Sequence, residues 1–307
     1  MKRPAQIQEK VILAPLTTYR IGGPARFYAR PKSVAELQQI LRWAQEEGWP
    51  LFVLGAGSNV LVSDRGFDGV ILHLQGFRGE LREPGKEGIW EVGSGTMLMH
   101  WVRRSISRGF SGAEALIGIP GTVGGALRMN AGAFAVEIGQ LLVNAEIIYL
   151  PADRTTATYE LKTVAPETAR FGYREAPGLE NTVILSARFK LTPGDKEKIL
   201  KQVREAIAMR RNQQPLKWPS CGSVFKRPPG DFAGRLIEVS GLKGLTYGGA
   251  QISSKHANFI TNLGHATADD VLTLIKMVKN RVWEEQGVRL EREVILIGFD
   301  EAELEGA

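Results

Sequence analysis

The order of hydrophobic and polar positions along the chain predicts five helices. Apolar residues recur every three or four positions, or lie between cap and stop signals, over residues 33–48, 97–109, 195–211, 233–239 and 267–286. Ser33 with Glu36, and Thr267 with Asp270, are pairs that cap the first turn of a helix. We expect Thr96 to open the helix that follows it.

Short runs rich in Val, Ile, Leu and Phe predict strands between these helices. They span residues 50–54, 60–63, 70–74, 89–95, 141–150, 183–191, 223–225, 257–261 and 293–299. The character of the sequence changes after Pro193-Gly194, where a long amphipathic helix leads into a polar, proline-bearing segment. We place a domain boundary there, between about residues 195 and 215.

Composition excludes several classes of protein. The chain has 307 residues, 43% hydrophobic and 23% charged, which argues against collagen, coiled coil and general disorder and suggests two or three domains. Its single cysteine, Cys221, allows no intrachain disulfide and no multi-cysteine metal site. No apolar run approaches the roughly 18 residues of a membrane helix, and no signal-like segment is visible, so we expect a cytoplasmic protein.

Two glycine-rich segments are candidate ligand loops. Gly55-Ala-Gly-Ser-Asn59 follows a predicted strand but matches no nucleotide motif, because no Lys-Ser/Thr follows and Val60 replaces the third glycine. By itself this segment is equally well explained as a tight turn. Residues 118–132 form a second segment rich in glycine, whose exposed backbone N–H groups would attract phosphate oxygens. Two such loops together suggest a binding site for a pyrophosphate.

Several short motifs follow one another along both halves of the chain. In the first half they are Thr18-Tyr-Arg-Ile-Gly-Gly23, Gly55-Ala-Gly-Ser-Asn-Val60, Gly118-Ile-Pro-Gly-Thr-Val-Gly-Gly125 and Asn130-Ala-Gly132. In the second half they are Phe171-Gly-Tyr-Arg174, Pro219-Ser-Cys-Gly-Ser-Val-Phe-Lys226, Ala233-Gly-Arg-Leu-Ile-Glu238, Lys255-His256 and Leu290-Glu-Arg-Glu-Val294. Taken in this order, these motifs resemble the UDP-N-acetylenolpyruvoylglucosamine reductase family, and the resemblance extends from about Leu16 to Gly298.

The resemblance implies an α+β fold and a cofactor. It implies a two-subdomain FAD-binding region of the vanillyl-alcohol-oxidase/PCMH type, followed by a smaller α/β substrate-binding domain. We assign residues 1–75 and 76–200 to the two FAD-binding subdomains and 201–307 to the substrate-binding domain. FAD is expected to bind noncovalently, with NADPH as co-substrate.

The resemblance also implies a reaction and three catalytic residues. NADPH reduces FAD, and a hydride then passes to C3 of an enolpyruvyl ether to give UDP-N-acetylmuramate for peptidoglycan. Arg174 and Glu293 would stabilise the enediolate-like intermediate, and Ser223 would donate a proton to C2. From the residues alone, a surface arginine, a turn serine and a solvated strand end are alternatives. We further hypothesise that burial keeps the Glu293 carboxyl partly protonated.

The remaining site predictions follow the same motifs. Cofactor contacts are expected from Gly55, Ala56, Gly57, Ser58, Asn59, Gly118, Ile119, Pro120, Gly121, Thr122, Gly125, Asn130 and Gly132. Substrate contacts are expected from Tyr173, Lys226, Arg227, Gln251 and His256. The histidines show no metal-ligand spacing, so no metal is expected. The segment between Arg174 and Val183 is too short for the family's tyrosine-bearing insertion, which indicates the shorter type.

Two alternative functions remain open at this level. One is a noncovalent-FAD oxidase of the same superfamily that acts on a sugar or alcohol. The other is a nucleic-acid-binding protein, since the net charge is +6. The basic residues are scattered, however, and their richest cluster, Met209-Arg-Arg211, ends a predicted helix. We therefore expect small-molecule substrates, no nucleic acid, no membrane insertion and a monomer.

Overall fold

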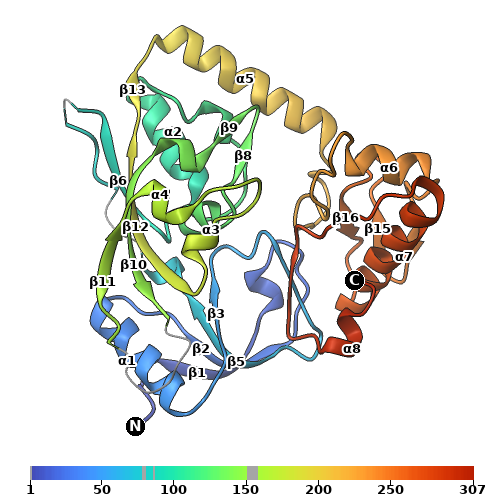
Figure 1. Cartoon of the computed structure of the whole chain (residues 1–307), viewed down its shortest axis with the longest axis horizontal. Helices are drawn as coiled ribbons and strands as arrows, with labels where there is room; N and C mark the ends of the chain where they lie inside the picture. The colour runs from blue at the N-terminus through green and yellow to red at the C-terminus, as the bar shows by residue number, and fades with distance from the viewer. Residues whose placement is uncertain (1, 78–80, 86, 151–157) are drawn as a thin grey trace. The chain divides into compact units, whose positions relative to one another are not determined.

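A computed structural model describes residues 2–77, 81–85, 87–150 and 158–307 (Figure 1). The chain divides into two compact units. The first unit comprises Met1–Gln8, Tyr28–Ala56 and Gly69–Arg210. The second comprises Glu9–Phe27, Gly57–Asp68 and Arg211–Ala307. The three predicted domain ranges stay a prediction.

The amino-terminal region contributes a small sheet and one amphipathic helix. The sheet has the order β1 (Ile7–Ile12), β2 (Pro24–Ala29), β5 (Phe67–His73) and β3 (Leu51–Leu54), and the boundary between the units passes through its first three strands. Strands β3 and β5 are parallel. Helix α1 (Val34–Glu46) begins where Ser33 accepts from the Glu36 N–H, as predicted, and it buries Leu37, Ile40 and Leu41.

A second sheet forms the body of the first unit. Its four antiparallel strands have the order β11 (Leu161–Val164), β10 (Leu142–Tyr149), β12 (Thr182–Lys190) and β6 (Ile89–Gly93) (Figure 1). Helix α2 (Leu98–Ser107) packs on it through Trp101, whose ring stacks on Phe189 of β12 at 4.3 Å. Short pieces complete the unit: β7 (Phe110–Ser111), β8 (Gly132–Ala133), β9 (Val136–Glu137), α3 (Val123–Arg128), α4 (Pro166–Ala169) and β13 (Thr192–Pro193).

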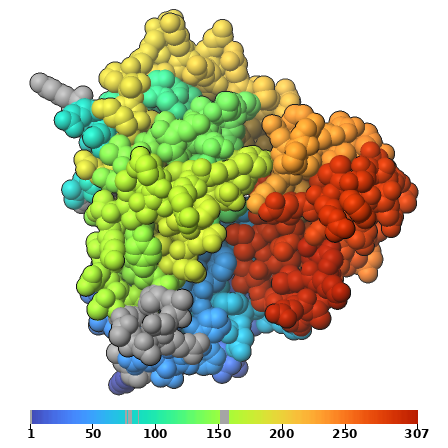
Figure 2. Space-filling view, viewed as in Figure 1, coloured from blue at the N-terminus to red at the C-terminus, as the bar shows by residue number. Residues whose placement is uncertain are grey.

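Helix α5 (Lys196–Gln213) carries the chain out of the first unit. Only Ile199 and Ala206 among its residues are buried, and Figure 2 shows it in yellow on the molecular surface. The boundary between the units falls at Arg210, inside this helix and inside the range predicted for a domain boundary.

The second unit has its own hydrophobic core around one long helix. Helix α7 (Ala268–Gln286) is capped reciprocally by Thr267 and Asp270, as the sequence predicts, and it packs on β15 (Ala250–Ile252) and α6 (Ala233–Val239). The unit also contains the strands β14 (Thr246–Tyr247), β16 (Ile260–Asn262) and the parallel pair β4 (Val60–Val62) and β17 (Ile295–Ile297), and helix α8 (Glu301–Leu304). No helix in the described part of the chain is long and apolar enough to span a membrane.

Four local predictions need correction. Met97, with no side-chain cap, precedes α2 in place of Thr96. The segment 223–225 forms one isolated bridge, Phe225 to Arg292, because its backbone also bonds to a side chain. Strands β16 and β17 are shorter than the predicted 257–261 and 293–299.

The fourth correction concerns α3, which lies in a segment too glycine-rich to predict a helix. Thr122 caps it by accepting from the Gly125 N–H. A Cβ on Gly124 would lie 2.9 Å from Cβ of Ser94, so glycine is needed where this helix meets β6.

Candidate active site

The two predicted glycine loops are in direct contact within the first unit. A Cβ on Gly55, which follows β3, would lie 2.6 Å from Oγ1 of Thr122, the residue that caps α3. Such a distance is too short for two real side chains, so the loops meet only because residue 55 is glycine. The structure thus brings together two segments that lie more than sixty residues apart in the sequence.

Backbone donors are available where these loops meet. Gly118 (φ +79°) and Gly121 (φ +129°) are left-handed, which turns their peptide planes out of a regular path. Val123 and Gly124 donate to the carbonyls of Thr96 and Ser94, at 2.9 Å each. Among the described residues, the N–H groups of Gly121 and Thr122 donate to no other protein group. Unused N–H groups beside side-chain-free backbone fit the phosphate oxygens of a dinucleotide.

The other half of the first loop belongs to the second unit. Gly57 is left-handed at φ +62°, and its carbonyl accepts from the Thr18 N–H at 3.0 Å. Nδ2 of Asn59 donates to the backbone carbonyl of Glu293 at 3.0 Å. The loop 57–59 is therefore bonded directly to the segment that carries one predicted catalytic residue.

Arg174 occupies a strained position at a tight turn. The N–H and carbonyl of Gly172 bond to the carbonyl and N–H of Glu175, so Tyr173 and Arg174 form a two-residue turn. Arg174 has φ +59°, which costs a residue with a side chain about 1 kcal/mol or more. Its guanidinium lies over the Tyr173 ring at 5.2 Å and donates to the Gly132 carbonyl at 3.0 Å.

Arg210 is a candidate that the sequence analysis missed. Its Cδ would lie 2.9 Å from a Cβ on Gly118, so it packs on the second glycine loop. Burial lowers the pKa of the Arg210 guanidinium, and the charge of Arg174 lowers it further. Its Nε is buried with no hydrogen-bond partner among the described residues. The basic cluster 209–211 was visible in the sequence, but the contact with Gly118 was not.

Ser223 and Glu293 lie on neighbouring segments of the second unit. The N–H of Glu293 donates to the carbonyl of Val224 at 2.8 Å, and the N–H of Lys226 donates to the carbonyl of Glu291 at 2.9 Å. The buried side chain of Asn258 bonds both backbone groups of Phe225, at 2.9 and 3.0 Å. Ser223 therefore sits on a segment fixed from two sides, and it is half-buried like Glu293.

A buried thiol lies beside this pair. Burial raises the pKa of Cys221 to about 12, and the negative charge of Glu293 contributes in the same direction. Tyr19 is buried against Cys221, and burial raises the pKa of its hydroxyl as well. Cys221 is therefore a protonated core side chain and no candidate nucleophile.

The predicted substrate residues of the second unit have partners of their own. Lys226 pairs with Glu291, and the Arg227 guanidinium lies over the Phe232 ring at 4.3 Å. Nε2 of Gln251 donates to Oγ1 of Thr246 at 3.1 Å. Burial lowers the pKa of His256, whose Nδ1 accepts from the Asn258 N–H at 3.3 Å. Lys226 and Arg227 follow Ser223 closely in sequence, and the backbone bond from Lys226 to Glu291 belongs to the same fixed segment.

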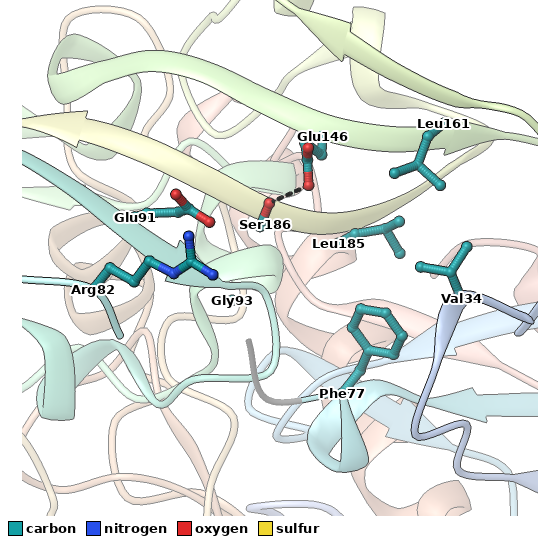
Figure 3. A pocket seen from close by; sticks show the side chains of 9 residues that line it. All are labelled: Val34, Phe77, Arg82, Glu91, Gly93, Glu146, Leu161, Leu185 and Ser186. Atoms are coloured by element: carbon teal, nitrogen blue, oxygen red, sulfur yellow. Dashed lines mark hydrogen bonds between the residues drawn. The ribbon is translucent and has the colours of Figure 1, made fainter. Parts of the chain in front are cut away.

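A pocket of about 260 Å³ in the first unit contains none of the predicted site residues (Figure 3). Its polar lining includes Ser186, which donates to Glu146 at 2.9 Å. Within the described residues, no cluster of three metal-ligating side chains occurs. Of the predicted catalytic residues, Arg174 belongs to the first unit, and Ser223 and Glu293 belong to the second.

Comparisons with known proteins match both halves of the chain. Residues 25–152 match an FAD binding domain, and residues 214–297 match the C-terminal domain of UDP-N-acetylenolpyruvoylglucosamine reductase. The chain is 42% identical, over 96% of its length and 93% of the relative, to that reductase from Synechococcus sp. (strain JA-3-3Ab). It is 41% identical to the reductase from Pediococcus pentosaceus, over 95% of each chain.

Solved structures agree with these matches. The crystal structure of UDP-N-acetylenolpyruvylglucosamine reductase from Thermus caldophilus has a TM-score of 0.78 at 38% identity, covering 95% of this chain and 99% of that one. A solvent-stable cholesterol oxidase, at 16% identity and a TM-score of 0.51 over 62% of this chain and 39% of its own, shares the fold alone.

The fold and the comparisons together show the class of protein to which this chain belongs. The fold and the FAD-binding match make the chain a flavoprotein oxidoreductase with a PCMH-type FAD-binding region, and the predicted α+β fold class is confirmed. Within that class, the chain belongs to the UDP-N-acetylenolpyruvoylglucosamine reductase family. Its length and its short segment after Arg174 are those of the family's shorter type.

Proposed function

We propose that this chain reduces UDP-N-acetylglucosamine enolpyruvate to UDP-N-acetylmuramate, with NADPH as hydride source, in the synthesis of peptidoglycan precursors. The observation that carries the proposal is the backbone pairing of 223–226 with 291–294, which joins the segments that carry Ser223 and Glu293 within the domain matched to these reductases. The chemistry needs both a proton donor and groups that stabilise negative charge.

The glycine loops of the first unit are the proposed FAD-binding residues. FAD, when bound, supplies the hydride transfer that no amino-acid side chain provides. The N–H groups of Gly121 and Thr122 would donate to its diphosphate, and Gly55 keeps the first loop close enough to contribute. Of the remaining predicted cofactor residues, Gly125 lies in α3, Asn130 and Gly132 follow that helix, and the others lie on the same two loops.

Arg174 is the proposed partner of the substrate carboxylate. Addition of hydride at C3 of an enolpyruvyl ether spreads negative charge from C2 into the adjacent carboxylate. A planar, permanently charged guanidinium binds such a group with two parallel hydrogen bonds. Arg210 adds a second positive charge near Arg174, as the lowered pKa of Arg210 indicates.

Ser223 is the proposed proton donor to C2. A serine hydroxyl is a weak acid at neutral pH, so the oxygen it leaves needs stabilisation. Lys226, three residues along the same fixed segment, supplies a nearby cation, and Glu293 on the paired segment supplies a carboxyl that assists the intermediate. Tyr173, Arg227, Gln251 and His256 are proposed to contact the rest of the substrate.

The proposed organisation completes this account. Residues 1–75 and 76–200 would form the FAD-binding subdomains and 201–307 the substrate-binding domain, in a cytoplasmic monomer. As the family resemblance implies, both substrates would use one cleft in turn, which would explain why the sequence carries no second nucleotide motif. Excess enolpyruvyl substrate should then inhibit flavin reduction by NADPH.

An anaerobic spectrum of the purified protein tests the proposal. NADPH should bleach the flavin absorbance bands, and UDP-N-acetylglucosamine enolpyruvate should restore them in the absence of oxygen. Acid precipitation should release the flavin, because its attachment is noncovalent. Restoration by oxygen alone, with no response to the enolpyruvyl compound, would instead favour an oxidase of the same superfamily.

A further inference from the structure

We propose that Asn130 and Glu137 are positioning residues that fix the turn carrying Arg174. This inference rests on the proposed function, because it concerns the role of Arg174 in the substrate step. Both residues lie in the first unit, on the segment between α3 and the short 3₁₀ helix Ile138–Leu141. Asn130 was predicted from its motif as a cofactor residue, and its contacts point to this different task.

Asn130 is enclosed by the protein and uses both ends of its amide. It is 1% exposed. Nδ2 donates to Oε2 of Glu137 at 2.8 Å and to the carbonyl of Gly172 at 2.9 Å. Oδ1 accepts from the N–H of Gly139 at 3.1 Å. The side-chain amide of Asn130 thus makes three of the four hydrogen bonds that it can make, which leaves little capacity for binding a ligand.

The partner of Asn130 in this network is the turn of Arg174. Gly172 is the first residue of the two-residue turn 172–175, so Asn130 holds that turn by its backbone. The Arg174 guanidinium donates in turn to the carbonyl of Gly132, two residues beyond Asn130. The segment therefore contacts the turn both at its base and at the end of the side chain.

Glu137 is one of three groups that fix which way the Asn130 amide faces, together with the Gly172 carbonyl and the Gly139 N–H. A carboxylate only accepts hydrogen bonds, so the NH₂ end of Asn130 must point toward it. The oxygen end must then face the Gly139 N–H, and the second NH₂ hydrogen remains for the Gly172 carbonyl. A glutamine at 137 would remove one of these three constraints and the negative charge beside Asn130, because its own amide donates as well as accepts.

Steric contacts fix the segment around Asn130. A Cβ on Gly132 would lie 2.5 Å from the carbonyl oxygen of Val136, and one on Gly139 would lie 2.8 Å from Oδ1 of Asn130. Asn130 itself has φ +40°, a left-handed conformation that asparagine tolerates better than most residues. The strained turn at Arg174 is thus maintained by a closely packed, hydrogen-bonded neighbour.

A double-mutant cycle between Glu137→Gln and Arg174→Gln tests the inference. We expect Glu137→Gln to keep its FAD and its rate of reduction by NADPH, and to slow oxidation by the enolpyruvyl substrate about 10-fold. If Glu137 acts through Arg174, the same change should have less than a 2-fold effect in the Arg174→Gln background. Equal effects in both backgrounds would overturn the proposal.

Controls separate this inference from the proposed function. Glu146→Gln removes another carboxylate acceptor of the first unit, one bonded to Ser186, and it should leave both half-reactions unchanged. Should Glu137→Gln fail to fold, Glu137→Asp carries the same cycle with a shorter carboxylate. If the unmodified protein is not oxidised by the enolpyruvyl substrate, the proposed function fails; if it is and the cycle is additive, only the positioning role fails.

Discussion

The backbone N–H of Glu293 donates to the carbonyl oxygen of Val224 at 2.8 Å, and this bond joins the segment that carries Glu293 to the segment that carries Ser223. The two segments lie near opposite ends of Arg211–Ala307, the longest stretch of the second unit. Asn258 bonds the same segment from its other side. The two segments that carry the proposed acid and its assisting carboxyl are therefore joined by main-chain bonds, which a conservative change of either side chain leaves in place.

Because the backbone of Arg174 is left-handed, glycine at this position should stabilise the protein relative to alanine, which is the reverse of its usual effect inside a helix. Arg174→Gly should be more stable than Arg174→Ala by about 1 kcal/mol, because glycine adopts φ +59° without strain. At Arg204, an exposed residue inside α5, the order should be the usual one: Arg204→Gly should have a free energy of unfolding about 1 kcal/mol lower than Arg204→Ala. Urea unfolding of the four variants measures both differences, and alanine being the more stable at both sites would refute the strain argument.

Contact between the glycine loops predicts that Gly55→Ala weakens FAD binding. The new Cβ would lie 2.6 Å from Oγ1 of Thr122, so the loops must separate and the N–H groups beside them must shift. We expect the Kd for FAD to rise at least 10-fold, measured by titration of the apoprotein. Gly85→Ala is the matched control, since a Cβ there meets no atom within 4 Å. Unchanged FAD affinity in Gly55→Ala would remove the loops from the cofactor site.

The thiol of Cys221 should be unreactive in the native protein. Because burial raises its pKa to about 12, the thiolate fraction at pH 8 is about three orders of magnitude below that of a free cysteine. Iodoacetamide at pH 8 should leave the folded chain unlabelled and should modify it fully in denaturant, as mass spectrometry can show. Rapid labelling of the folded protein would mean that Cys221 is neither buried nor protonated.

His73 predicts a loss of stability in mild acid. Burial lowers its pKa from 6.5 to about 4, with the charge of Arg30 contributing, and Nδ1 bonds the Tyr28 hydroxyl at 2.6 Å. Between pH 6.5 and 4 the unfolded chain takes up a proton that the folded chain does not. The free energy of unfolding should therefore fall as the pH falls through this window, by about 3 kcal/mol, and this contribution is complete well above pH 6.5.

Urea unfolding of variants assigns this pH dependence to His73. His73→Phe, although less stable overall, should lose the part of the slope between pH 6.5 and 4 that the histidine causes. His100→Phe changes an exposed histidine and should follow the unmodified protein. A slope that survives in His73→Phe would assign the acid sensitivity to other groups.

Sequence patterns reveal local structure here and miss contacts between distant segments. Helices α1 and α7 were predicted with their caps, because Ser33–Glu36 and Thr267–Asp270 act within one turn. The approach of Gly55 to Thr122 and the packing of Arg210 on Gly118 depend on tertiary folding, which no spacing encodes. Helix α3 was missed because its glycines, which disfavour a helix, are needed for its close packing.

The same limit applies to the candidate site. Motif order identified Arg174, Ser223 and Glu293 as candidates, yet the residues alone left each with an ordinary structural explanation. The network of Asn130 could not be foreseen, since its bonds to Glu137 and Gly172 join three separate segments. The roles proposed for all of these residues remain predictions that kinetics must test.

Separate measurement of the two half-reactions in Ser223→Ala tests the central claim most directly. The account predicts that NADPH reduces the bound flavin of the variant within 2-fold of the unmodified rate, because the hydroxyl takes no part in that step. Oxidation by UDP-N-acetylglucosamine enolpyruvate should slow by a factor of about 10² to 10⁴, the usual contribution of a positioned proton donor. An unchanged oxidation rate, or loss of FAD from the folded variant, would contradict the account.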